Sequence, residues 1–401
     1  MRRQHVIRKR AALSGLVFAA LAVTACSSAS SAGGGGAATA GSSASGGSSA
    51  TAGSTAAASN PGAGNTAEVA AAQQAIAPYV GHPSPFPATQ ALAKLPTPGS
   101  KFVFLQCGAP VCAIFAQLMP APAKALGVQF LTVNSGNTAT TSQAGAAAAL
   151  ADKPAAVLVG ASDPQLYGNY LHQLISAGSV VAGGGTVGGA SYGVQDAVGG
   201  SASVAHAGEL LADWVTVNKG SSANVVFFGT PELTFSAGMQ AAFAQTLSQR
   251  CPSCKADYQQ ISIANFGTTA PSQVVSYLQA HPSVNTVVFA SMEAATGLAA
   301  ALKDAHLSPT TLGFAPTASN QQDIADGGLT AGLALDFNVQ VWMQLNLAAR
   351  LIAHQTTAPS NLEVDMEFLT KSDLQGVNIS HGWTGYPDVA QRFATLWGLS
   401  K

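Results

Sequence analysis

Short apolar runs alternate with longer segments of helical spacing along most of the chain. The stretch 285–304, NTVVFASMEAATGLAAALKD, shows this unit clearly. Its apolar, β-branched start at 286–289 predicts a buried strand. After a turn at 291–293, apolar residues recur at helical spacing through Leu298 and Leu302. The pattern predicts one strand–helix unit of a parallel sheet, and such sheets bind ligands in the turns at the carboxyl ends of their strands.

The same unit recurs in two successive runs, which is typical of parallel βαβ units with right-handed crossovers. Two runs of about four units each predict an α/β protein of two similar lobes joined by a hinge, each a parallel sheet flanked by helices, rather than one barrel. Strands are expected at 101–108, 128–136, 155–163 and 179–185, then at 223–230, 256–264, 286–289 and 310–316, and finally at 329–337 and 363–370.

The expected lobes are discontinuous in sequence. Residues 101–199 and 337–362 are assigned to the first lobe, and residues 200–336 and 363–401 to the second. Before them, 66–100 begins with helical spacing and becomes proline-rich, which suggests a lead-in segment on the domain surface.

The N-terminus predicts export from the cytoplasm. Residues 1–10 carry five positive charges, and the next 15 residues are apolar but too few to span a membrane comfortably. They end in V-T-A-C at Cys26, which resembles the lipobox of bacterial lipoproteins. This resemblance implies a signal peptide at 1–25, a diacylated Cys26 and an extracytoplasmic protein held at the cell membrane by its lipid. An ordinary signal peptide with an incidental cysteine is the alternative.

Residues 26–65 consist largely of Ser, Gly, Ala and Thr without periodicity. A segment of this composition cannot bury a core, so it predicts a flexible tether between the anchor and the lobes.

Charge and histidine spacing exclude several classes of function. Without the five positive charges of the leader, 12 basic residues face 18 acidic ones, so no basic surface is left for nucleic acid. The eight histidines show no H-x-x-H or H-E-x-x-H spacing. We therefore expect no metal site and no cofactor.

Four cysteines remain besides Cys26, and an even number outside the cytoplasm suggests disulfides. Cys107 with Cys112 and Cys251 with Cys254 is the expected pairing, because each pair is close in sequence. Zinc and redox chemistry are the alternatives. Zinc would need a second C-x-x-C or a nearby histidine, and a redox pair would lie where a strand passes into a helix.

Two motifs suggest enzyme chemistry but lack its context. Residues 183–188 match G-x-G-x-x-G, yet the next segment is strand-like instead of helical. Residues 189–193 match G-x-S-x-G, but Ser191 has neither a strand before it nor a helix directly after it. We therefore predict no catalytic residue, with a secreted hydrolase using Ser191 as the alternative.

Three longer stretches of the chain carry a family resemblance. They are DAVGGSASVAHAGELLADWV at 196–215, HPSVNTVVFASMEAATGLAAALKDAHL at 281–307 and GFAPTASNQQDIADGGLTAGLALDFNVQVWMQ at 313–344. With them, the chain from 101 to about 370 resembles the type I periplasmic binding proteins, in the sugar-binding branch related to ribose-binding proteins. The resemblance implies a monomeric two-lobed clamp that closes on a small-molecule ligand and presents it to an ABC permease with ATP-binding subunits. A ligand sensor that reports to a membrane receptor is the alternative.

In this fold the ligand meets the turns that follow the strands. Several groups with which the family grips sugar hydroxyls are missing, including the acid that Ala315 replaces. We therefore expect a ligand less polar than a free sugar, held by apolar side chains with one acid at a polar or cationic end. The alternative is that these positions only pack. The candidate ligand-binding residues are Gln106, Val111, Ser162, Asp163, Thr186, Glu232, Phe235, Phe266, Ser291, Glu293 and Asp336.

Overall fold

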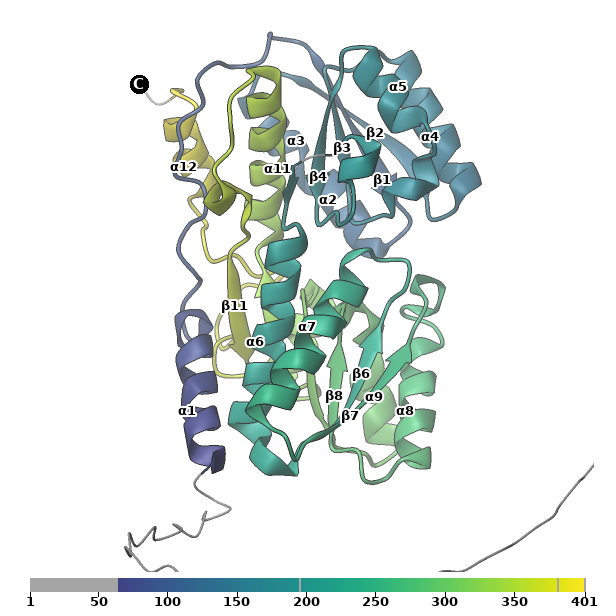
Figure 1. The fold of residues 1–401 in the computed structure, drawn as a ribbon, viewed down its shortest axis with the longest axis vertical. Helices are drawn as coiled ribbons and strands as arrows, with labels where there is room; N and C mark the ends of the chain where they lie inside the picture. Colours follow the sequence, from purple (N-terminus) through teal and green to yellow (C-terminus); the bar gives the residue numbers. More distant parts are fainter. Residues whose placement is uncertain (1–63, 195, 381, 400–401) are drawn as a thin grey trace, which may run out of the picture. The chain divides into compact units, whose positions relative to one another are not determined.

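The computed structural model describes residues 64–194, 196–380 and 382–399. The predicted signal peptide, the lipidation site at Cys26 and nearly all of the predicted tether lie outside the described residues. The described chain forms two α/β lobes (Figure 1), which confirms the predicted fold class.

The first lobe is built on a five-stranded parallel sheet with the order β2-β1-β3-β4-β5. Its inner strands are continuous apolar runs, because helices cover both faces of such a sheet. The strands are β1 (Lys101–Cys107), β2 (Gln129–Gly136), β3 (Ala156–Val159), β4 (Val180–Gly184) and β5 (Ala197–Val198). The helices that accompany them are α2 (Pro110–Leu118), α3 (Pro120–Ala125), α4 (Ala139–Ala151) and α5 (Tyr170–Ser176).

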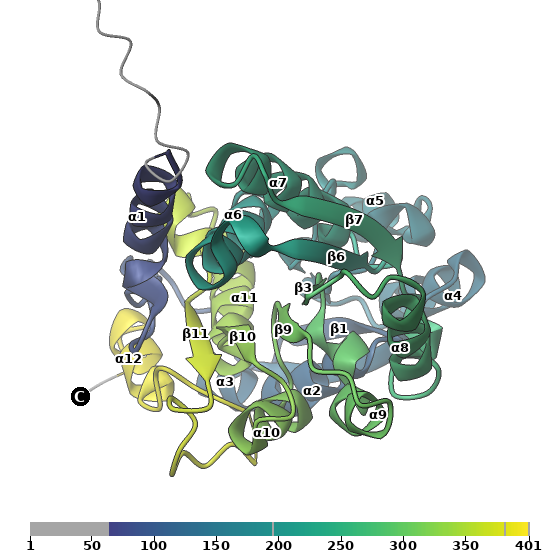
Figure 2. The ribbon, with the colours of Figure 1, turned by 90° about the horizontal axis from the view of Figure 1, so that it is seen from below.

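The second lobe repeats this plan with a four-stranded parallel sheet in the order β7-β6-β8-β9 (Figure 2). Its strands are β6 (Asn224–Gly229), β7 (Lys255–Gln260), β8 (Thr286–Phe289) and β9 (Thr310–Gly313). Its helices are α6 (Ser201–Lys219), α7 (Phe235–Arg250), α8 (Ala270–Ala280), α9 (Leu298–Asp304) and α10 (Ala318–Asp326).

The stretch after β8 differs from the continuous helix that its spacing predicts. A short 3-10 turn, η6 (Met292–Ala295), comes first, and α9 begins only after Gly297. Gly297 has a φ of +83°, a left-handed conformation that glycine adopts without steric cost. The chain therefore turns twice after β8, and this keeps residues 291–293 at the end of the strand.

The return to the first lobe is made by α11 (Phe337–Ile352), which packs against β3, β4 and β5. On either side of it in sequence, β10 (Ala331–Leu335) and β11 (Met366–Thr370) form an antiparallel pair that the sequence pattern did not distinguish from parallel strands. A parallel bridge between Phe314 and Leu333 joins β10 to the end of β9.

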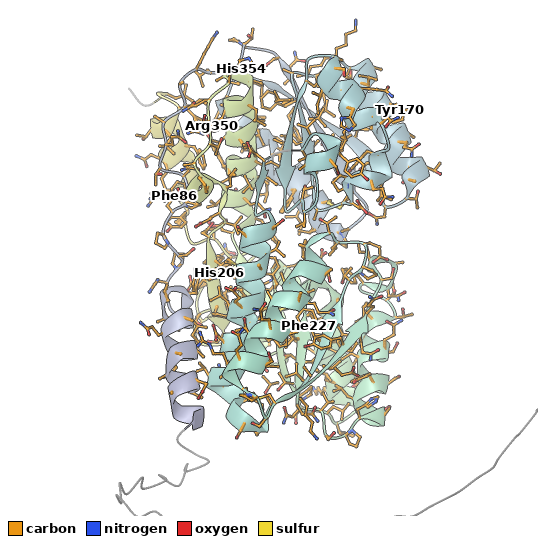
Figure 3. The ribbon with its side chains drawn as sticks, viewed as in Figure 1. Phe86, Tyr170, His206, Phe227, Arg350 and His354 are labelled. Atoms are coloured by element: carbon orange, nitrogen blue, oxygen red, sulfur yellow. A yellow bond between two sulfur atoms is a disulfide. The ribbon has the colours of Figure 1, made fainter. Side chains whose placement is uncertain are left out.

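The lead-in segment runs along one side of both lobes (Figure 1). Its helix α1 (Gly64–Ile76) packs against α6 of the second lobe. Further on, the amide of Ser84 donates to the carbonyl oxygen of Met366 at 3.0 Å. Near its end, the guanidinium of Arg350 on α11 donates to the carbonyl oxygens of Gln90 and Ala91 (Figure 3). The segment is therefore an integral strap across the hinge.

A helix that the sequence analysis missed, α12 (Val389–Leu396), packs against α11. The indole of Trp397 stacks on Trp342 with ring centroids 5.3 Å apart and donates to Oδ1 of Asn346 at 2.9 Å. The sequence analysis assigned residues 363–401 to the second lobe. Helix α12, near the end of this range, nevertheless contacts α11, which packs on the sheet of the first lobe.

Both expected disulfides are present. Cys107 at the end of β1 is bonded to Cys112 in α2, and Cys251 is bonded to Cys254 after α7. Each bond fixes a short turn beside a helix. Among the described residues, no helix combines the length and the apolar character needed to cross a bilayer.

We predict that Trp397→Ala lowers the free energy of unfolding by about 3–5 kcal/mol, because it removes a buried aromatic ring and leaves a cavity on α11. Urea denaturation followed by circular dichroism measures the change. The matched control is Leu399→Ala, whose side chain is exposed and should contribute less than about 0.5 kcal/mol. Equal effects of the two substitutions would show that α12 does not stabilise the fold.

Candidate ligand-binding cleft

An apolar cavity with a free volume of about 60 Å³, open to solvent on one side, lies where the two lobes meet. The strands of both sheets end at the cavity, as expected for parallel sheets. Its lining residues are Val111, Phe115, Ala161, Gly184, Gly185, Gly199, Ser203, Val204, Leu233, Phe235, Ser291, Glu293, Phe314, Ala315, Leu335, Phe337, Gln340 and Val364.

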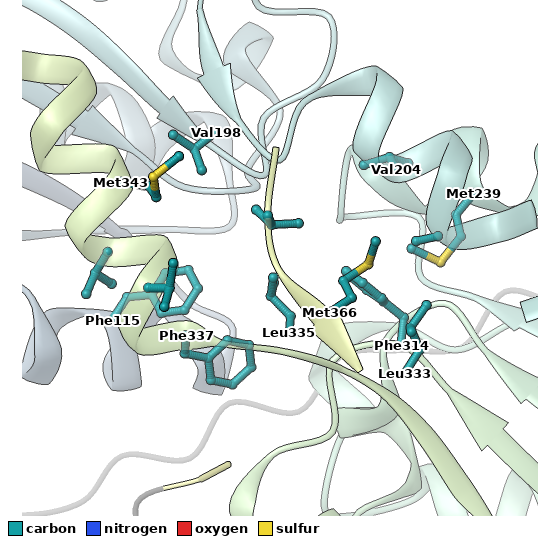
Figure 4. Packing of buried hydrophobic residues seen from close by; sticks show 14 of the residues in the cluster. Phe115, Val198, Val204, Met239, Phe314, Leu333, Leu335, Phe337, Met343 and Met366 are labelled. Atoms are coloured by element: carbon teal, nitrogen blue, oxygen red, sulfur yellow. The ribbon is translucent and has the colours of Figure 1, made fainter. Parts of the chain in front are cut away.

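Side chains from both lobes supply the apolar walls (Figure 4). Phe115 on α2 packs edge-on against Phe337, with ring centroids 5.3 Å apart. Phe235 at the start of α7 packs edge-on against Phe314, with centroids 6.0 Å apart. These rings belong to one hydrophobic cluster that continues from the first lobe through the hinge into the second.

Helix α11 is held close to the strand ends by Gln344. Its Nε2 donates to the carbonyl oxygens of Val159 and Ala182, both at 3.0 Å. Gly184 permits this approach, because a Cβ there would lie 2.6 Å from Oε1 of Gln344. One turn earlier on α11, Gln340 reaches the cavity itself.

The lobes are joined across the cleft by Thr234 of the second lobe. Its backbone N–H and its hydroxyl both donate to the carbonyl oxygen of Ala161, at 3.1 and 3.0 Å. The same hydroxyl accepts from the amide of Val187 at 3.2 Å. Because Ala161 and Val187 follow strands of the first lobe, these bonds hold the lobes together at the edge of the cavity.

The polar side chains of the lining are Ser203, Ser291, Glu293 and Gln340. Glu293 is only 3% exposed, and neither carboxylate oxygen has a hydrogen-bond partner among the described residues. Burial disfavours its charged form and raises the pKa of Glu293 from an ordinary value of 4.5 to about 7, although the nearby N–H of Val111 partly offsets the effect.

Gln340 is the second buried polar group without a full set of partners. It is 3% exposed, and its Oε1 has no hydrogen-bond partner in the described part of the chain. A Cβ built on Gly185 or Gly199 would lie 3.9 or 3.8 Å from its Nε2. The missing side chains at these glycines therefore leave the amide accessible from the cavity.

Four of the predicted ligand-binding residues line the cavity: Val111, Phe235, Ser291 and Glu293. Seven others do not, and several of them have structural partners instead. These seven are Gln106, Ser162, Asp163, Thr186, Glu232, Phe266 and Asp336.

Three predicted acids are occupied by local hydrogen bonds. Asp163 accepts from the amide of Gln165 at 2.9 Å and caps a 3-10 turn. Glu232 accepts from the hydroxyl of Ser262. Asp336 caps α11 and also accepts from the C-terminal tail.

The four remaining residues lie at strand ends or in turns. The hydroxyl of Thr186 donates to the carbonyl oxygen of Gly160 at 2.7 Å. Gln106 lies within β1, and Ser162 is buried after β3. Phe266 packs against the hydrophobic cluster that spans both lobes and against a separate cluster of the second lobe. None of these four side chains lines the cavity, although Ala161 beside Ser162 and Gly185 beside Thr186 do.

Several of the residues that the sequence analysis missed come from the hinge and from α11. They are Leu335 at the end of β10, Phe337 and Gln340 on α11, and Val364 just before β11. One signal was available. Gln340 and Gln344 are polar residues four apart in an apolar helical run, so they share one face of α11.

The G-x-S-x-G motif around Ser191 lies after β4. Ser191 lies exposed in a 3-10 turn, with Gly189 before it and the short β5 as the next strand. The ring Nε2 of His172 contacts its backbone oxygen at 3.1 Å. Among the described residues, no group of three or more His, Cys, Asp or Glu is arranged to hold a metal ion.

Two lobes with this sheet topology and a cleft at their strand ends define a binding protein of the type I periplasmic class. The chain belongs to the family of the periplasmic binding protein domain, which matches residues 108–356. This confirms the resemblance found in the sequence. A comparison with curated protein sequences gave no match.

Solved structures share the fold at low sequence identity. A solute-binding protein of an ABC transporter from Agrobacterium vitis, bound to allitol, is 20% identical with a TM-score of 0.61, covering 69% of this chain and 97% of that one. The glucose-galactose binding protein GanP from Geobacillus stearothermophilus is 15% identical with a TM-score of 0.61, covering 69% and 99%. A Caulobacter myo-inositol binding protein is 19% identical with a TM-score of 0.60, covering 69% and 95%.

We predict that Glu293→Gln stabilises the ligand-free protein more at high pH than at low pH. A carboxyl whose pKa is raised by folding lowers stability as pH rises from 4.5 to about 7, because the folded state disfavours its ionisation. The substitution removes this cost, so the gain in the free energy of unfolding should approach about 3 kcal/mol near pH 8 and fall towards zero near pH 4.5.

Urea denaturation across this pH range measures the difference between the variant and the parent protein. Asp304→Asn, at the exposed end of α9, is the matched control and should show no comparable trend. A gain for Glu293→Gln that does not change with pH would contradict the prediction.

Proposed function

We propose that the protein captures a small molecule less polar than a free sugar in the cleft and delivers it, as a monomer, to an ABC importer. The observation that carries this proposal is the lining of the cavity. It has many apolar side chains, a single carboxyl group, and no arginine, lysine or histidine among the described residues.

This composition is poorly suited to a polyol. Each buried hydroxyl that finds no partner costs about 1–3 kcal/mol, and a free sugar buries several. Sites that recognise hydroxyls contain matching donors and acceptors. The relatives described above were solved with polar ligands such as allitol and myo-inositol. Here Ser203, Ser291, Glu293 and Gln340 can satisfy only a few such groups, whereas the phenylalanines can bury an apolar body.

The fold supports capture and release. Thr234 joins the lobes at the cleft edge by a few hydrogen bonds, each worth about 1 kcal/mol. Opening the lobes therefore breaks few hydrogen bonds at this edge. A ligand that fills the apolar cavity would favour the closed form by burying its own surface and that of the rings. Closure around a ligand is the signal that a permease of this class would read.

Attachment to the membrane is part of the same proposal. The V-T-A-C sequence at Cys26 supports diacylation, and two acyl chains give stable anchoring. The small and polar residues that follow would let the lobes reach a permease in the same membrane while remaining free to rotate.

Replacing the acylated residue tests the anchor. Cys26→Ser should move the protein from the membrane fraction to the soluble fraction, because no acyl chain can be attached. Fractionation with immunoblotting measures this, and mass spectrometry of the N-terminal peptide identifies the acyl chains. The neighbouring substitution Ser30→Ala should leave the protein in the membrane fraction. If Cys26→Ser stays at the membrane with its N-terminus unmodified, the lipid anchor is wrong.

Ligand polarity is tested by calorimetry with a series of aryl and alkyl alcohols, beside ribose, galactose and myo-inositol. We expect at least one alcohol to bind and the sugars to fail. Phe235→Ala should weaken that binding about tenfold or more by removing an aromatic wall. Phe266→Ala removes a ring outside the lining and is the control. Binding of a free sugar with no binding of the alcohols would overturn the proposed ligand class.

A further inference from the structure

The cavity contains one ionisable group and nothing to neutralise it. Among the lining residues, Glu293 is the one side chain that can carry a charge. Its own turn supplies no cation, since the residues beside it are Ser291 at the N-cap of η6 and Met292 and Ala294 within it. A buried carboxylate is normally paired with a cation or saturated with hydrogen bonds. Glu293 has neither among the described residues.

The other acids near the hinge either have hydrogen-bond partners or lie outside the cavity. Asp365 belongs to the second group, since neither of its carboxylate oxygens has a partner among the described residues. Asp336 receives hydrogen bonds from the amides of Asn338 and Val339, from the hydroxyl of Thr384 and from the amide of Gly385, at distances of 2.6–3.0 Å. Asp365 and Glu367 are also buried, but neither of them lines the cavity. Glu293 is therefore the acid that a ligand in this cavity can reach.

We propose that the ligand carries a cationic amine, and that Glu293 binds this amine through its free carboxylate oxygens. This inference rests on the proposed function, since it places the amine on the less polar ligand bound between the lobes. An ammonium group supplies both the positive charge and the N–H donors that the carboxylate lacks. The apolar part of the ligand would contact the rings of Phe235 and Phe314, and Gln340 would be left to bind a second polar group.

The electrostatics of the cleft favour a cation over an anion or a neutral group. An anion would meet Glu293 without any lining arginine or lysine to offset the repulsion. A neutral hydroxyl could donate one hydrogen bond but would leave a charged carboxylate buried or force it to stay protonated. A charge pair inside an apolar cavity is strengthened because little water screens it.

A second role for Glu293 must be separated from this one. The N–H of Val111, in the first turn of α2, lies close enough to lower the pKa of Glu293 slightly, so the carboxyl could serve to hold the lobes closed. A residue that only holds the lobes would affect every ligand alike. A residue that binds an amine would affect charged ligands selectively, so selectivity is the decisive measurement.

The probes are 2-phenylethylamine and 2-phenylethanol, which differ little in shape but differ in charge, together with longer alkyl and aryl amine–alcohol pairs. Isothermal titration calorimetry on the purified protein near pH 8 should show the amine of at least one pair binding about 30-fold or more tightly than its alcohol, because it pairs with a buried carboxylate. Glu293→Gln should abolish this preference. Glu209→Gln, on the exposed face of α6, should retain it.

The pH dependence adds a readout that a purely structural role would not produce. Below pH 7 the affinity for the amine should fall about tenfold for each pH unit, because Glu293 must lose its proton to pair with the cation, whereas the affinity for the alcohol should stay constant. The ionisable groups on the helices packed against η6 are Tyr277 on α8 and Asp323 and Asp326 on α10. The pKa of Glu293 is governed instead by burial and by Val111.

Failure of the inference can be told apart from failure of the proposed function. If alcohols bind as tightly as their amines, or if Glu293→Gln weakens both equally, the cationic ligand is wrong while the apolar cleft stands. If none of the amines binds but the alcohols do, the same conclusion follows. If ribose, galactose or myo-inositol binds and neither member of any pair does, both the ligand class and the amine are wrong.

Discussion

The architecture depends on the way Asp336 begins helix α11 at the hinge. Its carboxylate accepts from the amides of Asn338 and Val339 and so satisfies two of the free N–H groups at the helix start. Its other oxygen accepts from Thr384 and Gly385 in the C-terminal tail. The residue is fully buried, and burial raises its pKa although these hydrogen bonds act in the opposite direction. One side chain therefore fixes the start of α11, the crossing between the lobes and the path of the tail.

From this point α11 determines what the cleft can contact. Because its first turn is fixed, Phe337 and Gln340 reach the cavity, and Gln344 bonds to the carbonyl oxygens at the ends of β3 and β4. A helix anchored at both its start and its side cannot rotate to exchange these residues. The turns after the strands contribute other lining residues, including Ala315 and Glu293. Because the lining comes partly from a fixed helix and partly from separate turns, a fold shared with sugar-binding proteins can have an apolar cleft.

The sequence revealed the repeating elements because they depend on local periodicity. The run at 286–289 is β8, and both disulfides join cysteines that are near neighbours in the chain. Features that depend on distant contacts were missed. Helix α12 is stabilised by stacking on Trp342, which is far away in sequence. The roles of the acids were equally hidden, because a carboxylate such as Asp336 or Glu232 that receives protein hydrogen bonds has the same local sequence pattern as one left free for a ligand.

The free carboxylate of Glu293 is costly to the fold, and this cost is informative. Its raised pKa means that ionisation of this carboxyl destabilises the ligand-free protein. A glutamine at this position would avoid that cost. Groups that destabilise a fold and lie in a cleft are typical of functional sites, where the partner that satisfies them arrives with the ligand. An amine that pairs with Glu293 would remove this cost and so stabilise the closed protein. Ligand binding and lobe closure would then be coupled through one charge, in addition to the apolar surface that the lobes bury together.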